Sequence, residues 1–135
     1  MKNELIEKLT AYFKTKSEII AVYLFGSYAE GREGDTSDID IGILFDIADP
    51  VMAKKKTDNL MVELSRILRK DIHPVILNLA GEEILRQIFL KGKCILVNNK
   101  KKLVRYKMTT FARIADFAYY KKRMQSGLIR NVMEG

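Results

Sequence analysis

Residues 24–45 read LFGSYAEGREGDTSDIDIGILF, and this stretch decides the fold. Apolar segments on both sides of its polar centre predict one buried strand over 19–25 and a second over 38–45. Asp38 and Asp40 are one residue apart on the second strand, so both side chains leave the same face of the sheet. Two such carboxylates repel each other, and a bound divalent cation removes that repulsion.

The connection between the two strands begins with a Gly-Ser turn. Gly26 allows the backbone to turn sharply and to lie close to a ligand. Ser27 supplies a hydroxyl and can begin a helical turn whose free N–H groups bind anions. Because Mg²⁺ prefers a few carboxylates together with phosphate oxygens of its substrate, the turn and the acid pair predict a site for a metal-bound triphosphate.

The rest of the chain alternates between helical and strand patterns. Apolar residues at helical spacing predict helices at 2–15, 51–69 and 81–91 and from about 102 towards Gly127, and short apolar runs predict further strands at 73–77 and 94–97. This order indicates an α/β or α+β fold, with a small mixed sheet flanked by helices and a C-terminal helical tail. We expect a core domain at 1–98 and, at 99–135, a helical extension that packs on the core or on a partner.

The composition restricts the class of protein. Of the 135 residues, 47% are hydrophobic and 30% are charged, as in an ordinary globular domain. No apolar run reaches the roughly 18–20 residues of a membrane span, so we expect no membrane partner. The lone cysteine, Cys94, excludes an internal disulfide and favours the cytoplasm. An acidic protein partner or solubility explains the net charge of +7 as well as a polyanion does, so direct nucleic-acid binding is not expected.

The spacing between the turn and the acid pair matches a known signature. Gly26-Ser27 is followed by ten residues and then by Asp38-Ile39-Asp40. In these residues the chain resembles the DNA polymerase β-type nucleotidyltransferases, in particular their minimal, MNT-type members. The resemblance implies a polymerase β-like fold, a site for two Mg²⁺ ions, ATP as the substrate, and nucleotide binding at the Gly-Ser turn.

The resemblance also implies a third acidic residue, placed after the helix that follows the acid pair. Asp71 stands at that point in the chain. We therefore predict Asp38, Asp40 and Asp71 as the catalytic residues and metal ligands. His73 shares the strand parity of Asp71, so both could reach the site, but we interpret His73 as a partly buried histidine on an edge strand.

The chain departs from the family pattern directly after the Gly-Ser turn. Many MNT-type proteins carry one basic residue there and a second before the next glycine, whereas this chain has Tyr28 and Glu30. The nearest cation is Arg32, which either takes over a triphosphate contact or is a solvated loop charge. We include Arg32 with Gly26 and Ser27 in the predicted nucleotide-binding set.

The resemblance implies a partner as well as a reaction. The chain is too short for a separate acceptor-holding domain, and MNT-type proteins are commonly antitoxins paired with a HEPN-domain ribonuclease toxin. We therefore predict a Mg²⁺-dependent protein adenylyltransferase that transfers AMP from ATP to a tyrosine of a cognate HEPN toxin, within a hetero-oligomer. Two alternatives stay open: an antitoxin that neutralises by contact and has a vestigial nucleotide site, and a small-molecule or RNA nucleotidyltransferase that needs a partner subunit.

Overall fold

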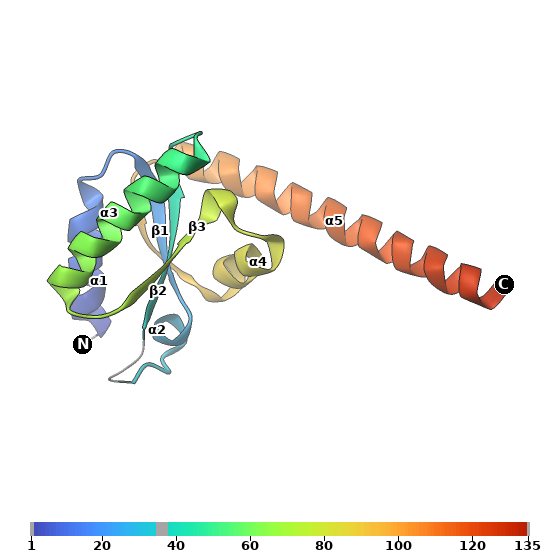
Figure 1. Cartoon of the computed structure of the whole chain (residues 1–135), viewed down its shortest axis with the longest axis horizontal. Coiled ribbons are helices and arrows are strands. Elements are labelled where there is room, and N and C mark those ends of the chain that lie inside the picture. The colour runs from blue at the N-terminus through green and yellow to red at the C-terminus, as the bar shows by residue number, and fades with distance from the viewer. Residues whose placement is uncertain (1, 35–37, 135) are drawn as a thin grey trace. The chain divides into compact units, whose positions relative to one another are not determined.

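Four strands and five helices follow one another along the chain (Figure 1), in a computed structural model that describes residues 2–34 and 38–134. The helices are α1 (Lys2–Lys14), α2 (Ser27–Glu30), α3 (Pro50–Leu68), α4 (Glu82–Lys91) and α5 (Lys100–Glu134). The strands are β1 (Ile19–Phe25), β2 (Ile39–Phe45), β3 (Ile72–Ile76) and β4 (Lys93–Val97), and a 3₁₀ helix, η1 (Leu77–Leu79), follows β3. Each predicted helix and strand is confirmed, although α5 continues through Gly127 instead of ending near it.

The strands form one mixed sheet with the order β3-β2-β1-β4. β1 pairs antiparallel with both β2 and β4, whereas β2 and β3 are parallel. Pro74 lies in β3, at the edge of the sheet, where its missing N–H costs no ladder hydrogen bond. The parallel register places Asp40 opposite His73, which brings the acid pair beside β3.

The crossover between the two parallel strands is α3, whose ends are set by local signals. Asp49 is its N-cap: the Val51 N–H donates to Asp49 Oδ1 at 3.0 Å, and Pro50 occupies the first turn. The helix ends at Arg69, which has a positive φ of 53° and donates its N–H to the Ser65 carbonyl. The chain can then turn directly into β3.

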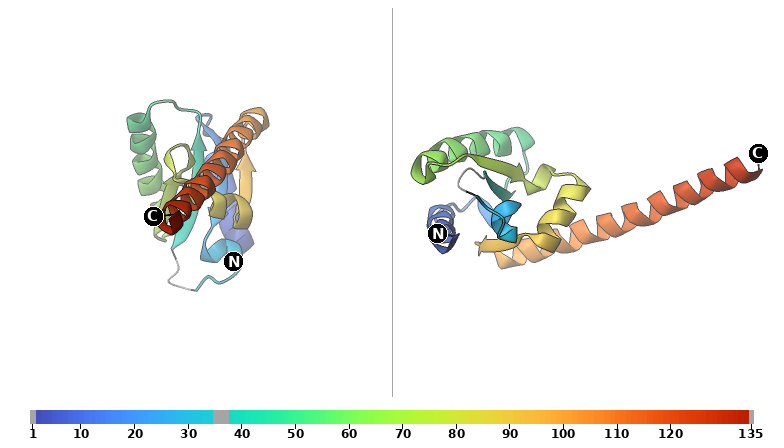
Figure 2. Two further views of the ribbon diagram at one scale, coloured as in Figure 1. Left: turned by 90° about the vertical axis from the view of Figure 1, so that its right-hand side faces the viewer. Right: turned by 90° about the horizontal axis from the view of Figure 1, so that it is seen from below.

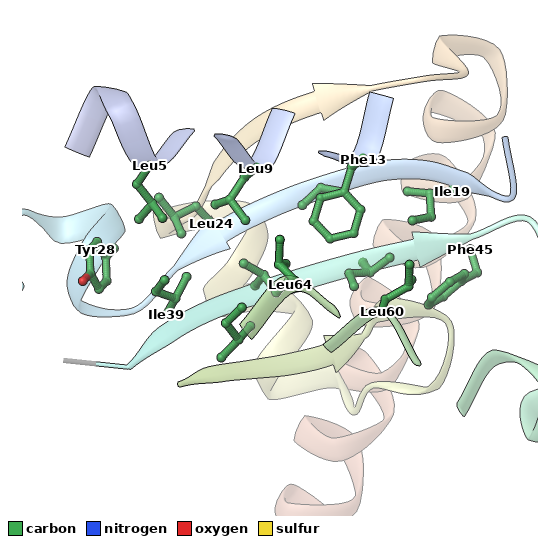
Figure 3. Packing of buried hydrophobic residues seen from close by; sticks show 14 of the residues in the cluster. Leu5, Leu9, Phe13, Ile19, Leu24, Tyr28, Ile39, Phe45, Leu60 and Leu64 are labelled. Atoms are coloured by element: carbon green, nitrogen blue, oxygen red, sulfur yellow. The ribbon is translucent and has the colours of Figure 1, made fainter. Parts of the chain in front are cut away.

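The main core lies between one face of the sheet and the helices α1 and α3, which Figures 1 and 2 show on the same side. In Figure 3, the apolar side chains of α1 and α3 point at those of β1 and β2. The buried members of this core include Leu5, Leu9, Phe13, Ile19, Val22, Leu24, Ile39, Ile41, Ile43, Phe45, Leu60 and Leu64. The alternating residues of β2 account for this arrangement, since every second side chain reaches the same face.

The opposite face of the sheet is covered by η1 and α4. Leu77, Leu85 and Ile88 are buried there. Gly42 of β2 makes room for them, because a Cβ at this position would lie 3.0 Å from Leu77 Cδ2 and 3.5 Å from Ile88 Cδ1. This cover contacts the middle of the sheet and leaves the start of β2, where the acid pair lies, partly exposed.

The chain divides into two compact units, Met1–Lys100 and Lys101–Gly135. The first contains the whole sheet and every predicted site residue, and the second is α5 beyond its first residue. Whether the extension packs on the core or on a partner stays a prediction. In the part of the chain that the structure describes, no helix has the length and apolar character needed to cross a membrane.

Candidate active site

Asp38 and Asp40 lie at the start of β2, on the face opposite the α1–α3 core. Ile39, between them, is fully buried in that core. The Asp38 side chain is 41% exposed and the Asp40 side chain 28% exposed, and both approach the same neighbour on β3. The structure therefore brings the two predicted acids together on one face.

The neighbour that both acids approach is His73. Its Nε2 is 3.3 Å from Asp38 Oδ2, and its Nδ1 is 3.6 Å from Asp40 Oδ1. The interpretation of His73 as partly buried is wrong, because its side chain is 64% exposed. The only sign of this contact in the sequence was that His73 shares the strand parity of Asp71. The parallel register between β2 and β3 brings His73 beside the two acids.

The environment of Asp40 disfavours its negative charge. Burial is the largest cause that raises the pKa of the Asp40 carboxyl, and the nearby Asp38 raises it further. The imidazole of His73 acts in the opposite direction, but the pKa stays raised. A cation at this position would therefore be attracted by a carboxylate that lacks full solvation.

Gly26 lies directly against the Asp40 carboxylate. Its φ of +70° belongs to the left-handed region, which favours glycine. A Cβ at Gly26 would lie 3.0 Å from Asp40 Cγ and would overlap with Asp40 Oδ2. Glycine is thus required twice, by the backbone conformation and by the carboxylate. The predicted nucleotide turn and the acid pair are in contact.

Ser27 begins α2, the short helix after this turn. Its carbonyl accepts hydrogen bonds from the backbone N–H groups of Gly31, which has a φ of 72°, and of Arg32, the latter at 2.8 Å. These bonds close the loop tightly against the end of β1. The nucleotide-binding role of Ser27 stays a prediction.

Tyr28 is a core residue. It is 5% exposed and belongs to the main hydrophobic cluster. Lys70 Nζ donates a hydrogen bond of 2.7 Å to the Tyr28 hydroxyl and lies 5.4 Å from the centre of its ring. Position 28, where relatives often have a basic residue, is therefore used here for packing.

Glu30, the second departure from the family pattern, pairs with Arg32. Arg32 Nε donates to Glu30 Oε2 at 3.0 Å, and the guanidinium Nη2 contacts the same oxygen. The hydrogen bond from Arg32 holds the pKa of the Glu30 carboxyl below its usual value. Arg32 would have to exchange this partner for a phosphate, and its predicted nucleotide contact stays a prediction.

Asp71 is exposed and directly precedes β3, where its carbonyl accepts a hydrogen bond of 3.0 Å from the Ile39 N–H. Among the described residues, no group of three or more Asp, Glu, His or Cys side chains is arranged to hold a metal ion. The predicted ligand role of Asp71 is therefore untested. The acid pair alone fits Mg²⁺, which commonly takes one or two carboxylates and completes its shell with phosphates and water.

The fold and this site place the chain in a known family. A family model described as polymerase beta, nucleotidyltransferase matches residues 7–101, a range that contains every predicted site residue. The chain belongs to this nucleotidyltransferase family. No curated protein matches it significantly.

Several solved structures share the fold over almost the entire chain. One chain of the complex between the tri-AMPylated Shewanella oneidensis HEPN toxin and its MNT antitoxin is 20% identical, with a TM-score of 0.63, and the match covers 98% of this nucleotidyltransferase and 99% of that chain. A chain of a toxin–antitoxin complex with AMP-PNP is 23% identical, with a TM-score of 0.63 and 98% coverage of both chains. A chain of the MntA–HepT toxin–antitoxin complex is 19% identical, with a TM-score of 0.61 and coverage of 97% and 98%. At these identities the likeness shows the fold.

Proposed function

We propose that this nucleotidyltransferase transfers AMP from ATP to a tyrosine of a cognate HEPN ribonuclease toxin and thereby acts as its antitoxin. The contact between Gly26 and Asp40, with Asp38 on the same face, carries the proposal, because it joins the predicted nucleotide turn to the predicted metal ligands. The fold shared with chains of toxin–antitoxin complexes, one with AMP-PNP and one with a tri-AMPylated toxin, supports the choice of nucleotide and partner.

Asp38 and Asp40 would hold Mg²⁺, and Asp71 is the further acid that we predict for a two-metal site. When bound, Mg²⁺ neutralises charge on the phosphates and stabilises the attacking and leaving oxygens. The protein contributes a fixed frame for this chemistry, since Ile39 anchors the start of β2 in the core. The cost of ionising a half-buried carboxylate such as Asp40 favours the metal-bound state.

The other predicted residues orient the nucleotide, and the acid pair receives a proton. Gly26 and Ser27 would face the triphosphate, with Arg32 as the cationic contact. The tyrosine oxygen of the toxin attacks the α-phosphorus of ATP, the bond from that phosphorus to the bridging oxygen breaks, and pyrophosphate leaves. The phenol proton passes to a carboxylate of the acid pair.

The acceptor would come from a second protein, in a hetero-oligomer. The sheet and its helices account for residues up to Lys100, and the rest of the described chain is one helix. A chain with this fold forms a complex with an AMPylated HEPN toxin, which supports a protein as the acceptor. We place the reaction in the cytoplasm, which supplies ATP and keeps the exposed thiol of Cys94 reduced.

A transfer assay tests this proposal. The purified protein is mixed with its cognate HEPN protein, Mg²⁺ and ATP labelled at the α-phosphate, and label on the HEPN protein is measured. We expect transfer by the wild type and a loss of about 10²- to 10⁴-fold in the double variant Asp38→Asn, Asp40→Asn. Asp58→Asn, on the exposed side of α3, removes an acid without touching the site and should transfer normally.

The outcomes separate the alternatives. The proposal would be refuted if the double variant still transfers AMP, or if the wild type transfers none. If the wild type and the double variant neutralise the toxin equally and neither labels it, the protein acts by contact. If RNA or a small molecule is labelled without any HEPN protein, the acceptor is different.

A further inference from the structure

We propose that His73 is the third ligand of the metal site, beside Asp38 and Asp40, and that its imidazole makes the site accept Mn²⁺ more readily than an all-oxygen site would. This role rests on the proposed function, because it takes the acid pair as the holder of a divalent cation. It assigns to His73 the place that the sequence predicts for Asp71.

The sheet itself places His73 next to the acids. Asp40 and His73 are partners in the parallel pairing of β2 and β3, on strands about 4.8 Å apart. Ile39 directly precedes Asp40, Ile72 directly precedes His73, and both isoleucines are buried in the main core. The side chains of Asp40 and His73 therefore leave the sheet on the opposite face. The juxtaposition is therefore fixed by backbone hydrogen bonds between rigid elements.

The two acids approach different nitrogens of the ring, of which only one can bind a given cation, so a cation would require the ring to turn. The distances of 3.3 Å and 3.6 Å exceed the usual length of an N–H···O hydrogen bond, so neither carboxylate holds the ring tightly. Donors on adjacent corners of an octahedron with bonds of about 2.1 Å lie about 3.0 Å apart. Among the described residues, no group of three or more such donors is arranged to hold a metal ion. The ring, which is 64% exposed, has room to turn one nitrogen towards the space between the carboxylates.

Electrostatics favours an imidazole over a third carboxylate. A third carboxylate would add a further negative charge beside two acids that lie on one face, whereas a neutral imidazole donates a lone pair without a charge. Asp71 is exposed at the strand entry, and only its backbone carbonyl takes part in a hydrogen bond with Ile39. Imidazole suits transition metals, while Mg²⁺ prefers oxygen ligands, so the metal preference should move towards Mn²⁺.

The competing role for His73 is that of an ion-pair partner that occupies the place of the cation. The two roles predict opposite effects of removing the ring. A ligand strengthens metal binding, so its loss weakens the affinity, whereas a competitor weakens metal binding, so its loss strengthens the affinity. Metal affinity therefore separates the roles without any measurement of AMP transfer.

His73 is the only histidine in the chain, which makes it a unique spectroscopic probe. We would titrate the full chain with Mn²⁺, with and without AMP-PNP, and follow the free ion by electron paramagnetic resonance. Pulsed measurements on the complex formed without AMP-PNP would compare protein carrying ¹⁴N-histidine with protein carrying ¹⁵N-histidine. We expect a nitrogen coupling to Mn²⁺ that changes with the isotope.

The variants give the matched affinities. We expect His73→Ala to weaken Mn²⁺ binding at least about tenfold and to change Mg²⁺ binding less. His73→Asp should restore binding with a lower preference for Mn²⁺ over Mg²⁺. Glu83→Gln, exposed on α4, is the control and should bind like the wild type. Circular dichroism would verify that each variant is folded.

Two kinds of negative result are distinguishable. If Asp38→Asn with Asp40→Asn abolishes Mn²⁺ binding but His73→Ala leaves it unchanged or strengthens it, the acid pair holds the metal and the role of His73 is overturned. Weakening by Asp71→Asn without weakening by His73→Ala overturns it in favour of Asp71. If the wild type binds no Mn²⁺ even with AMP-PNP, the proposed metal site itself fails, and the role of His73 fails with it.

Discussion

On one face of β2, Ile39, Ile41 and Ile43 are fully buried against α1 and α3, as Figure 3 shows for Ile39. On the other face of the same strand, Asp40 keeps 28% of its side chain exposed and lies against Gly26 and His73. The two faces alternate residue by residue, yet one holds only hydrocarbon and the other holds charge.

The difference between the faces shows how a small domain can keep a carboxylate in an unfavourable place. Burial raises the pKa of Asp40, which means that folding with this group ionised costs free energy. The apolar face of the same strand offsets this cost, because a fully buried Ile or Leu side chain contributes about 1.5–3 kcal/mol. Stability and chemistry are thus supplied by alternate residues of β2.

The largest expected effect is on the apolar face. Ile41→Ala should lower the free energy of unfolding by about 2–5 kcal/mol, since it removes fully buried atoms and leaves a cavity. Urea denaturation followed by circular dichroism measures this change. Val62→Ala, at an α3 position that is 57% exposed, is the control and should cost less than about 1 kcal/mol. An equal cost at both positions would contradict the assignment of the core face.

A pair of glycine substitutions tests the charged face. Gly26 and Gly31 have nearly the same φ, 70° and 72°, but different ψ values. At Gly31, with a ψ of 21°, alanine should cost about 1–2 kcal/mol in backbone strain, whereas at Gly26, with a ψ of -148°, the conformation is essentially restricted to glycine. Only at Gly26 does the new Cβ meet Asp40, because nothing lies within 4 Å of a Cβ at Gly31. Gly26→Ala should therefore abolish AMP transfer and weaken Mn²⁺ binding, while Gly31→Ala should retain both.

Because alanine strains the backbone more at Gly26 than at Gly31, circular dichroism would verify that both variants are folded before their transfer is compared. Equal losses of transfer in both variants would mean that loop conformation, and not the contact with Asp40, matters. Equal retention in both would mean that the Asp40 carboxylate moves aside without consequence.

The smallest expected effect is a change of stability with pH. Because the pKa of Asp40 is raised in the folded state, the folded protein binds more protons than the unfolded chain between the ordinary aspartate pKa and the raised value. The contribution of Asp40 to stability therefore falls as pH rises through this window. Asp40→Asn should be more stable than the wild type at neutral pH and equal to it below the ordinary aspartate pKa.

Thermal unfolding at several pH values, with EDTA present to remove divalent cations, measures this difference. Asp58→Asn on α3 controls for the loss of one negative charge from an exposed position. A stability gain for Asp40→Asn that is the same at acidic and neutral pH would show that ionisation of Asp40 is not its cause.

The amino-acid sequence determined the elements of this fold, because their signals are local. Apolar spacing is sufficient to predict α1, α3 and α4, and the Asp49-Pro50 pair marks the start of α3. The Gly-Ser turn and the acid pair are also visible in the sequence, since their spacing of ten residues matches a family signature. The placement of Asp38 and Asp40 on one face follows from strand geometry alone.

Only the tertiary structure decided which side chains from distant segments meet at the site. The contact of His73 with both acids depends on the parallel register between β2 and β3, which α3 and the packing of the core set together. The inward direction of Tyr28 depends on the core under α2, where Lys70 meets its hydroxyl. The residue of β3 that lies opposite Asp40 cannot be read from local periodicity, because this pairing arises from contacts between segments that are far apart along the chain.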